Sequence, residues 1–211
     1  MTDDLACLLY LLAHDEAAEG PYDRSRTELL VRAAALVDLA LRGRLGEDGG
    51  TVTVSGTEPT GDPVLDGVLR DAAGHGWKAL VRRHRKRTLT EVEDRLAAEG
   101  LLTVKAPRTR FGTRRVTVTD RAVPAALRAR LSTALHGDGP VREIPAADAA
   151  LLALAAAGGI RSVLSRQDQK TFRARVDACT GRLAALAPGL ETAVRALPTT
   201  MIAAQGGMGG S

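Results

Sequence analysis

Residues 27–45 (TELLVRAAALVDLALRGRL) constrain the fold more than any other part of the chain. Apolar residues fall on every side of a helix here, interrupted between Leu29 and Leu41 only by Arg32 and Asp38. A helix that is apolar all round is normally buried at the centre of a domain. At a rise of 1.5 Å per residue the stretch spans roughly 28 Å, about the width of a small domain. We therefore predict a central buried helix, with Thr27 as its N-cap and Gly43 at its end.

Arg32 is the anomaly of this predicted helix. A guanidinium on a buried helix is costly unless a carboxylate or an anionic ligand meets it. An internal salt bridge, or a head group that reaches water along its own stem, would explain Arg32 without a function. A bound anionic ligand would instead give Arg32 a functional role. The sequence leaves these alternatives open.

Charge is unevenly distributed along the 211 residues. Residues 1–69 hold 5 Lys/Arg against 13 Asp/Glu, residues 70–130 hold 16 against 6, and residues 131–211 hold 8 against 6. The local balances are therefore −8, +10 and +2. The excess of positive charge in the middle third indicates an anionic partner such as a lipid headgroup, a nucleic acid or phosphate.

The remaining pattern predicts a mainly α fold: a helical bundle around the central helix, with one or two small β-hairpins. Aromatic residues make up only 2% of the chain, so the core must consist of Leu, Val and Ala, which favours closely packed helices. Hairpins are expected at 44–54 and 101–118, and Asp62 or Thr60 should cap a helix that starts at Pro63. We expect one domain over 1–200 and a flexible Gly-rich tail over 201–211. The other segments expected to be helical are 5–13 (helix or strand), 77–87, 89–99, 124–136, 146–157, 160–165, 168–187 and 189–197.

We find no motif that indicates an enzyme, a metal site or a cofactor. The four histidines are scattered, and neither a Gly-rich phosphate loop nor a GxSxG sequence is present. Asp62 and Asp66 could face the same way on a helix, but capping and surface exposure explain them better than acid–base catalysis. Cys7 and Cys179 fit no metal-binding spacing and are expected to be buried free thiols, which favours a reducing cytoplasm. No signal peptide is recognisable, and no apolar stretch reaches the roughly 18 residues of a membrane span.

The basic run at 82–87 (RRHRKR) is the strongest chemical signal in the sequence. Such a density of charge must be solvated or matched by anions, and the arginine fork suits phosphate oxygens. Two classes of partner fit. An anionic membrane surface would gain about 1 kcal/mol per Lys or Arg near the headgroups. Nucleic acid is the alternative, because a helix followed by a strand, a basic loop and a strand is the order of a winged-helix DNA-binding regulator.

The nucleic-acid alternative is the weaker one. The helix before the expected hairpin carries Glu91, Glu93, Asp94 and Glu99, which would meet DNA phosphates with negative charge. Trp77 and Phe111 are too few to form a stacking platform for single strands.

Three segments, RAAALVDLALRGRL (32–45), PTGDPVLDGVL (59–69) and EDRLAAEGLL (93–102), resemble the Golgi phosphoprotein 3 family in its bacterial branch. The resemblance covers about residues 5–197. It implies a mostly helical fold with a projecting hairpin used in self-association. It also implies a peripheral membrane protein that binds phosphatidylinositol 4-phosphate and, in eukaryotes, the cytoplasmic tails of Golgi glycosyltransferases.

The resemblance also implies a set of site residues. Arg32 falls where the family's lipid pocket has an arginine, and Lys86 falls on a second basic position. Leu89 falls on a third, so Arg85 or Arg87 is expected to substitute there. The pocket tryptophan corresponds to Asp23, with Tyr22 beside it, which would place a carboxylate near the phosphate and disfavour specificity for the 4-phosphate.

The sequence thus predicts a non-enzymatic, cytoplasmic protein, reversibly associated with the inner membrane surface through an anionic phospholipid headgroup. The expected phosphate-binding residues are Arg32, Arg85, Lys86 and Arg87. Protein tails are possible further partners, as is a second copy of the chain bound through the 101–118 hairpin.

Overall fold

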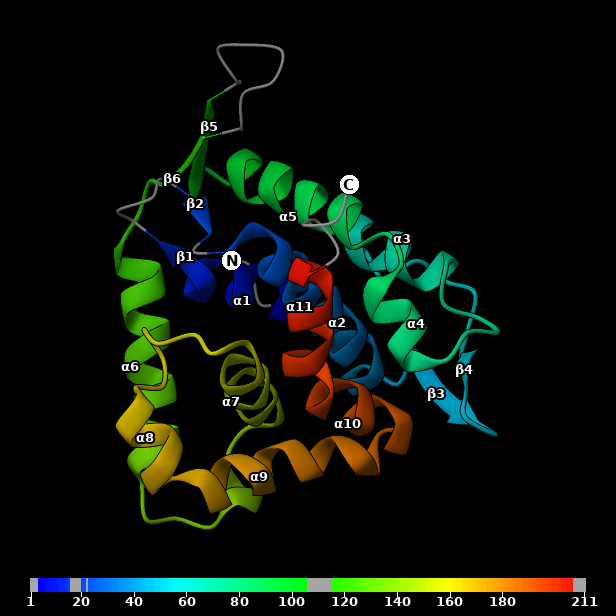
Figure 1. Ribbon diagram of the computed structural model, residues 1–211. Helices are drawn as coiled ribbons and strands as arrows, with labels where there is room; N and C mark the ends of the chain where they lie inside the picture. The colour runs from blue at the N-terminus through cyan, green and yellow to red at the C-terminus, as the bar shows by residue number, and fades with distance from the viewer. Residues whose placement is uncertain (1–3, 16–19, 22, 106–114, 207–211) are drawn as a thin grey trace.

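The computed structural model describes residues 4–15, 20–21, 23–105 and 115–206, and every structural statement below refers to these residues. Figure 1 confirms the mainly α fold, with helices packed around a central one. The helices are α1 (Leu5–Ala13), α2 (Arg24–Leu41), α3 (Pro63–Arg70), α4 (Trp77–Arg82), α5 (Arg85–Ala98), α6 (Ala122–His136), α7 (Ala146–Gly158), α8 (Arg166–Thr171), α9 (Arg173–Gly181), α10 (Pro188–Arg195) and α11 (Leu197–Gly206), with 3-10 turns at Val141–Glu143 and Arg182–Ala185.

Helix α2 is the predicted central helix, and α1, α3, α4, α5, α7 and α11 all pack against it. Every residue from Thr27 to Ala40 is buried. The predicted N-cap, Thr27, is wrong. Asp23 caps the helix by accepting a hydrogen bond from the Arg26 N–H (3.0 Å), and the Thr27 hydroxyl donates to the Asp23 carbonyl (2.8 Å). The helix ends at Leu41, and Gly43 follows with a φ of +68°, which is the left-handed conformation that glycine adopts easily.

Both predicted hairpins are present. β3 (Leu45–Asp48) pairs antiparallel with β4 (Thr51–Val54), and β5 (Leu102–Lys105) pairs with β6 (Arg115–Val118). A third ladder, β1 (His14–Asp15) with β2 (Gly20–Pro21), was not predicted, because strands of two residues are too short to show alternation. In Figure 1 the β5–β6 hairpin extends from the top left of the molecule, beyond the end of α5.

The chain between Trp77 and Gly100 forms two helices, as predicted, but the boundary between them lies inside the basic run and not after it. Helix α4 ends at Arg82, and His84 then adopts a φ of +53°. This left-handed residue redirects the chain, so that α5 starts inside the basic run, at Arg85. As predicted, α5 stops just before Gly100, whose φ is +76°.

The C-terminal third departs most from the prediction. Helices α6 and α7 confirm the predicted segments 124–136 and 146–157, but 160–165 forms turns in place of a helix. The predicted helix 168–187 is divided into α8, α9 and a 3-10 turn, and α8 starts at a capping box in which Ser165 and Asp168 bond each other's backbone N–H groups. The predicted flexible tail is helical through Gly206 in α11, and 207–211 lie outside the described residues.

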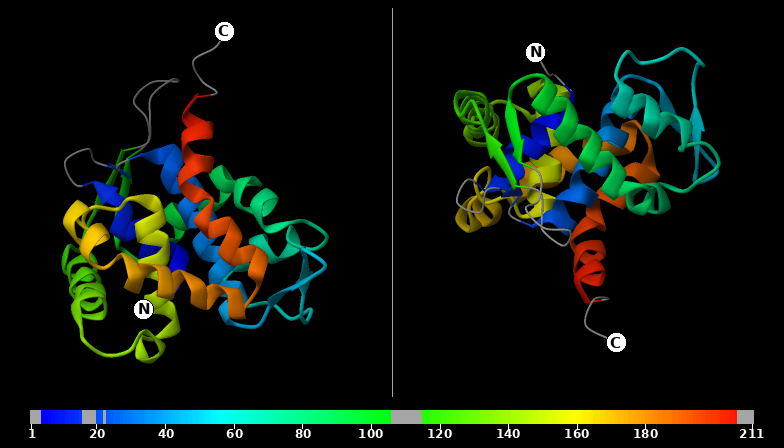
Figure 2. Two further views of the ribbon diagram at one scale, coloured as in Figure 1. Left: turned by 60° about the horizontal axis from the view of Figure 1, so that its bottom comes forward. Right: turned by 90° about the horizontal axis from the view of Figure 1, so that it is seen from above.

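Two regions on different sides of α2 concern function. Helices α4 and α8 lie at opposite ends of the molecule in Figure 1 and in the left view of Figure 2. The first region is the junction of α4 and α5, and the second is where α7 leads into α8.

Candidate functional site

Arg32 is buried at the junction of α4 and α5, with 1% of its surface exposed. Its Nε donates a hydrogen bond to the Leu80 carbonyl of α4 (3.2 Å), and its Nη1 donates to Thr88 Oγ1 of α5 (3.1 Å). Among the described residues no carboxylate forms an ion pair with it, and its buried Nη2 has no hydrogen-bond partner. The internal salt bridge that would have explained Arg32 without a ligand is therefore absent from this part of the chain.

Burial of this guanidinium has an electrostatic cost. Removal from water lowers the pKa of Arg32 to about 10, and the positive charges of Arg83 and Arg87 act in the same direction. Asp71 and Glu91 partly oppose the shift from a distance. The arginine is nonetheless charged at neutral pH. The protein therefore holds, inside its core, a positive charge whose Nη2 group has no hydrogen-bond acceptor among the described residues.

The first turn of α5 lies directly against Arg32 and carries no side-chain cap. Its N-cap residue, His84, makes no capping hydrogen bond, although its ring nitrogen lies 3.7 Å from Asp71 Oδ2. The start of a helix has free N–H groups and a partial positive charge, and both favour an anion. The first turn of α5 therefore adds a partial positive charge beside Arg32, which contacts this turn through Thr88.

The structure brings the other predicted site residues to this turn, but two of them already have carboxylate partners. Arg85 Nε lies 3.3 Å from Glu28 Oε2, and Arg87 Nε lies 2.7 Å from Glu91 Oε1. Lys86 is exposed and forms no ion pair with a described residue. The exposed Arg82 and Arg83 flank the same junction at the end of α4, and the predicted site did not include them.

Asp23, which occupies the position of the family's pocket tryptophan, lies at the start of α2 as its N-cap. It caps α2 nine residues before Arg32, about 13 Å away along the helix axis, and its Oδ2 lies 3.9 Å from Arg26 Nε. That this carboxylate would lie near the phosphate, as the resemblance implies, stays a prediction. Tyr22 is outside the described residues.

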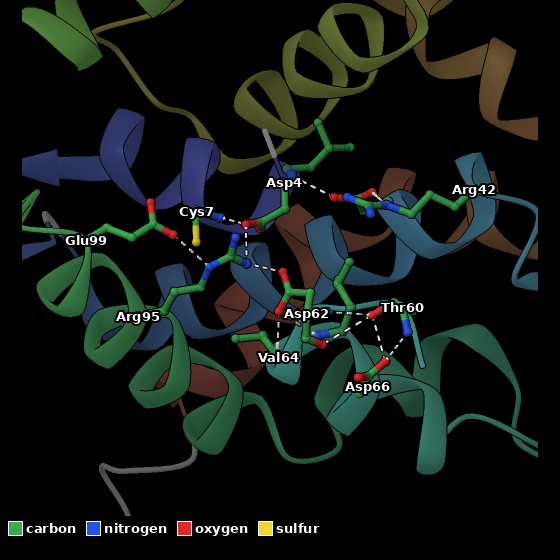
Figure 3. Close-up of polar contacts among 12 residues, drawn as sticks. Asp4, Cys7, Arg42, Thr60, Asp62, Val64, Asp66, Arg95 and Glu99 are labelled. Carbon is green, nitrogen blue, oxygen red and sulfur yellow. Dashed lines mark hydrogen bonds and ion pairs between the residues drawn. The ribbon is translucent and has the colours of Figure 1, made fainter. Parts of the chain in front are cut away.

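The motif at 59–69 forms a structural network, shown in Figure 3. Asp62 caps α3 by accepting from Val64 N (2.8 Å) and Leu65 N (3.3 Å), as predicted. It also pairs with Arg95 of α5, and Arg95 Nη1 lies 2.8 Å from Asp4 Oδ2 at the start of α1. Burial raises the pKa of Asp4, whereas its hydrogen bond from Cys7 N lowers it. One arginine thus links the starts of α1 and α3 to α5.

The neighbouring acids are also structural. Asp66 accepts hydrogen bonds from Thr60 Oγ1 (2.7 Å) and Thr60 N (2.6 Å), and these bonds lower its pKa. Asp38 accepts from Leu5 N (2.9 Å) and pairs with Arg42. Asp62 and Asp66 thus have capping roles, in line with the sequence prediction. Cys7 and Cys179 are buried and free, also as predicted.

The order of elements expected for a winged helix is present, but α5 differs from the recognition helix of a DNA-binding protein. One face of α5 packs against α2. Glu93 of α5 is fully buried and pairs with Arg24 at 2.7 Å, so it does not contribute to the surface charge. Asp94 and Glu99 remain exposed on the helix. The loop 106–114, which would form the tip of the wing or of a self-association hairpin, is outside the described residues.

These features define a mainly helical protein whose central helix carries a buried arginine with a vacant donor, set against an uncapped cationic helix start. None of the helices in the described ranges is both long and apolar enough to cross a membrane. The chain belongs to the Golgi phosphoprotein 3 (GPP34) family, whose model matches residues 5–197, nearly the whole chain. A comparison with individual curated proteins gave no match. Membership in this family suggests a lipid-binding or adaptor role.

Proposed function

We propose that this protein is a peripheral adaptor that binds anionic lipid at the junction of α4 and α5. The observation that carries the proposal is the buried Nη2 of Arg32, which has no hydrogen-bond partner among the described residues and lies beside an uncapped helix start. A buried donor without a partner costs about 1–3 kcal/mol, and a phosphate oxygen would satisfy it.

Arg32 would contact one phosphate oxygen, and the N–H groups of the first turn of α5 would contact others. Lys86 would add a long-range attraction worth about 1 kcal/mol near a charged membrane. Because Arg32 is almost fully covered, an anion reaches it only when side chains at the junction move. Arg85 and Arg87, which are held by Glu28 and Glu91, are the side chains that would exchange a carboxylate for the phosphate.

The family resemblance supports phosphatidylinositol 4-phosphate as the headgroup. The missing aromatic wall at Asp23 argues for a broader preference among anionic lipids. Vesicles of neutral lipid, of neutral lipid with phosphatidylserine, and of neutral lipid with phosphatidylinositol 4-phosphate at equal total charge would separate these two expectations. Stronger flotation with the phosphoinositide than with phosphatidylserine would establish headgroup specificity.

Two variants test the site. Arg32→Met should weaken vesicle binding by roughly 10- to 100-fold, the value of a charge-assisted hydrogen bond to phosphate. Lys86→Glu should weaken it and reduce its dependence on salt. Arg142→Glu is the matched control for Lys86→Glu, because Arg142 is exposed, has no described partner and lies in the turn before α7.

Absence of binding to either anionic vesicle at low salt would refute the proposal. A gel shift with duplex DNA tests the alternative function. Sequence preference that persists as the salt concentration rises would favour a DNA-binding regulator.

A further inference from the structure

A hollow of about 240 Å³ lies between the end of α1, the start of α2 and the end of α7. Its lining is mostly apolar and includes Leu12, Ala13, Leu30 and Ile160, with His14, Thr27 and Ser162 as neutral polar members. Arg26 and Arg161 also line it. Side chains on a helix turn by about 100° per residue, so Leu30 and Arg32 point in nearly opposite directions from α2. The hollow is therefore separate from the lipid site proposed above.

Two glycines and a hydroxyl shape this hollow. A Cβ on Gly158 would lie 2.4 Å from Leu30 Cδ1, so a larger residue here would force the Leu30 side chain or the packing of α7 on α2 to shift. Gly159 has a φ of +63° and ends α7 at the edge of the hollow. Ser162 Oγ donates to the Leu12 carbonyl (3.0 Å) and ties the following turn to α1.

The hollow continues into a cationic surface. A second space of about 410 Å³ shares Asp23, Arg26, Gly159 and Arg161 with it and extends to Arg166. A third, of about 460 Å³, shares Arg166 and Gln169 with the second and extends over Lys170 and Arg173. Each space shares lining residues with the next, so the three lie next to one another. We call this row of spaces, from the apolar hollow to the start of α9, the trough.

Much of the positive charge along this trough is not neutralised. Arg161, Arg166 and Lys170 are exposed and form no ion pair with any described residue. Arg26 donates to the Gly158 carbonyl (3.3 Å) and faces Asp23, the one carboxylate among the described lining residues.

The other acids near the trough are already engaged. Asp168 bonds the backbone of Ser165 (3.0 Å) and lies 3.3 Å from His136, and Asp177 lies 3.8 Å from Arg173. The trough therefore favours a ligand that carries several negative charges.

We propose that this trough binds an acidic peptide segment, with one apolar side chain of that segment seated in the hollow. The hollow is smaller than the roughly 300–1,000 Å³ of most small-molecule sites, which suits one side chain better than a lipid. The basic residues lie on α2, α8, α9 and the turn after α7, so an extended polyanion fits them better than a single compact headgroup. Among the described lining residues none is Trp, Tyr or Phe, which disfavours the stacking of nucleic-acid bases.

A random peptide library displayed on phage and selected on the immobilised full chain would test this proposal. Selected peptides should be enriched in Asp and Glu and share one Leu, Ile or Phe. A fluorescently labelled selected peptide should bind the double variant Arg161→Glu/Arg166→Glu about tenfold or more weakly than it binds the native chain. It should bind Arg142→Glu as tightly as the native chain. Replacement of the apolar residue of the peptide by Ser should also weaken binding about tenfold or more, because that side chain would leave the hollow.

Selection without acidic enrichment, or equal affinity of the peptide for the double variant and the native chain, would overturn the proposal. Displacement of the peptide by single-stranded RNA or by anionic vesicles at similar charge concentration would also overturn it. Both arginines are exposed, so the double variant should fold normally, and circular dichroism melting checks this. The trough and the lipid site can fail independently, since the double variant should still float with vesicles and Arg32→Met should still bind the peptide.

Discussion

Replacement of Arg32 by methionine should make the protein more stable while it removes the proposed lipid contact. Burial lowers the pKa of Arg32 by between two and three units from its ordinary value, to about 10. Each pKa unit corresponds to about 1.4 kcal/mol, so holding this charge in the core costs about 3 kcal/mol. Methionine has a similar length, is apolar and adapts to irregular spaces in a core. Replacing a buried ion by a well-packed apolar residue is often neutral or stabilising.

The lost hydrogen bonds offset part of this gain. Thr88 Oγ1 still donates to the His84 carbonyl (3.2 Å) in the variant, whereas the Leu80 carbonyl loses the hydrogen bond that it accepts from Arg32. A buried carbonyl that loses its hydrogen bond costs about 1–2 kcal/mol. The net expectation is a stabilisation of about 1–2 kcal/mol, which for a chain of this size raises the melting temperature by about 3–6 °C.

Urea denaturation of the native chain and of Arg32→Met measures this difference. Arg24→Met is the control, because it leaves the fully buried Glu93 without its arginine and should destabilise the protein. Inorganic phosphate should raise the melting temperature of the native chain and not of Arg32→Met, because only the native chain has the anion site. If Arg32→Met is less stable than the native chain by more than about 1 kcal/mol, Arg32 is a structural residue and the reasoning fails.

Three further predictions follow from the described contacts. Arg95→Met should destabilise the protein by about 3–5 kcal/mol in urea denaturation, since it leaves two buried carboxylates uncompensated; a loss below about 1 kcal/mol would contradict the network of Figure 3. Gly158→Ala should cost about 1–3 kcal/mol because its methyl group would meet Leu30, whereas Gly181→Ala, with open space around it, should be neutral or slightly stabilising; equal melting temperatures for the two variants would refute this. The hydrogen bonds that lower the pKa of Asp66 give stability that is present above its unfolded value of 3.8 and lost as the pH falls through the lowered value, so Asp66→Asn should flatten the acid dependence of the urea midpoint between about pH 5 and about pH 2.

The sequence predicted those parts of the fold whose signal is long and local. The all-round apolar pattern of α2 predicted a central buried helix because no other position can bury every side of it. Its start was misplaced, because Asp23 and Thr27 are both good caps and residues 24–26 are polar. The division between α8 and α9 near Phe172 involves neither Gly nor Pro, so no breaker residue marks it in the sequence.

The candidate sites depend on contacts that the sequence cannot give. The resemblance named Arg32, Arg85, Lys86 and Arg87, and the structure brings them to one junction. The resemblance could not indicate that Arg32 donates to a carbonyl and a hydroxyl and has no ion pair with a described carboxylate. The trough was not predicted, because its lining comes from three separate stretches of the chain (12–14, 23–30 and 158–173) and no stretch alone has a recognisable motif.

Charge counted along the sequence is a poor guide to charge available at the surface. The first third has an excess of acids and the middle third an excess of bases. Ion pairs between the two thirds, such as Glu28 with Arg85 and Asp62 with Arg95, neutralise part of both. What remains for an external anion at the junction of α4 and α5 is therefore less than a balance of +10 suggests. The last third has a balance of only +2, yet it contributes most of the trough, because Arg161 and Arg166 there have no described ion pair. Unpaired cations, and not local net charge, are what an anionic partner can bind, since a cation that is already paired must first give up its carboxylate.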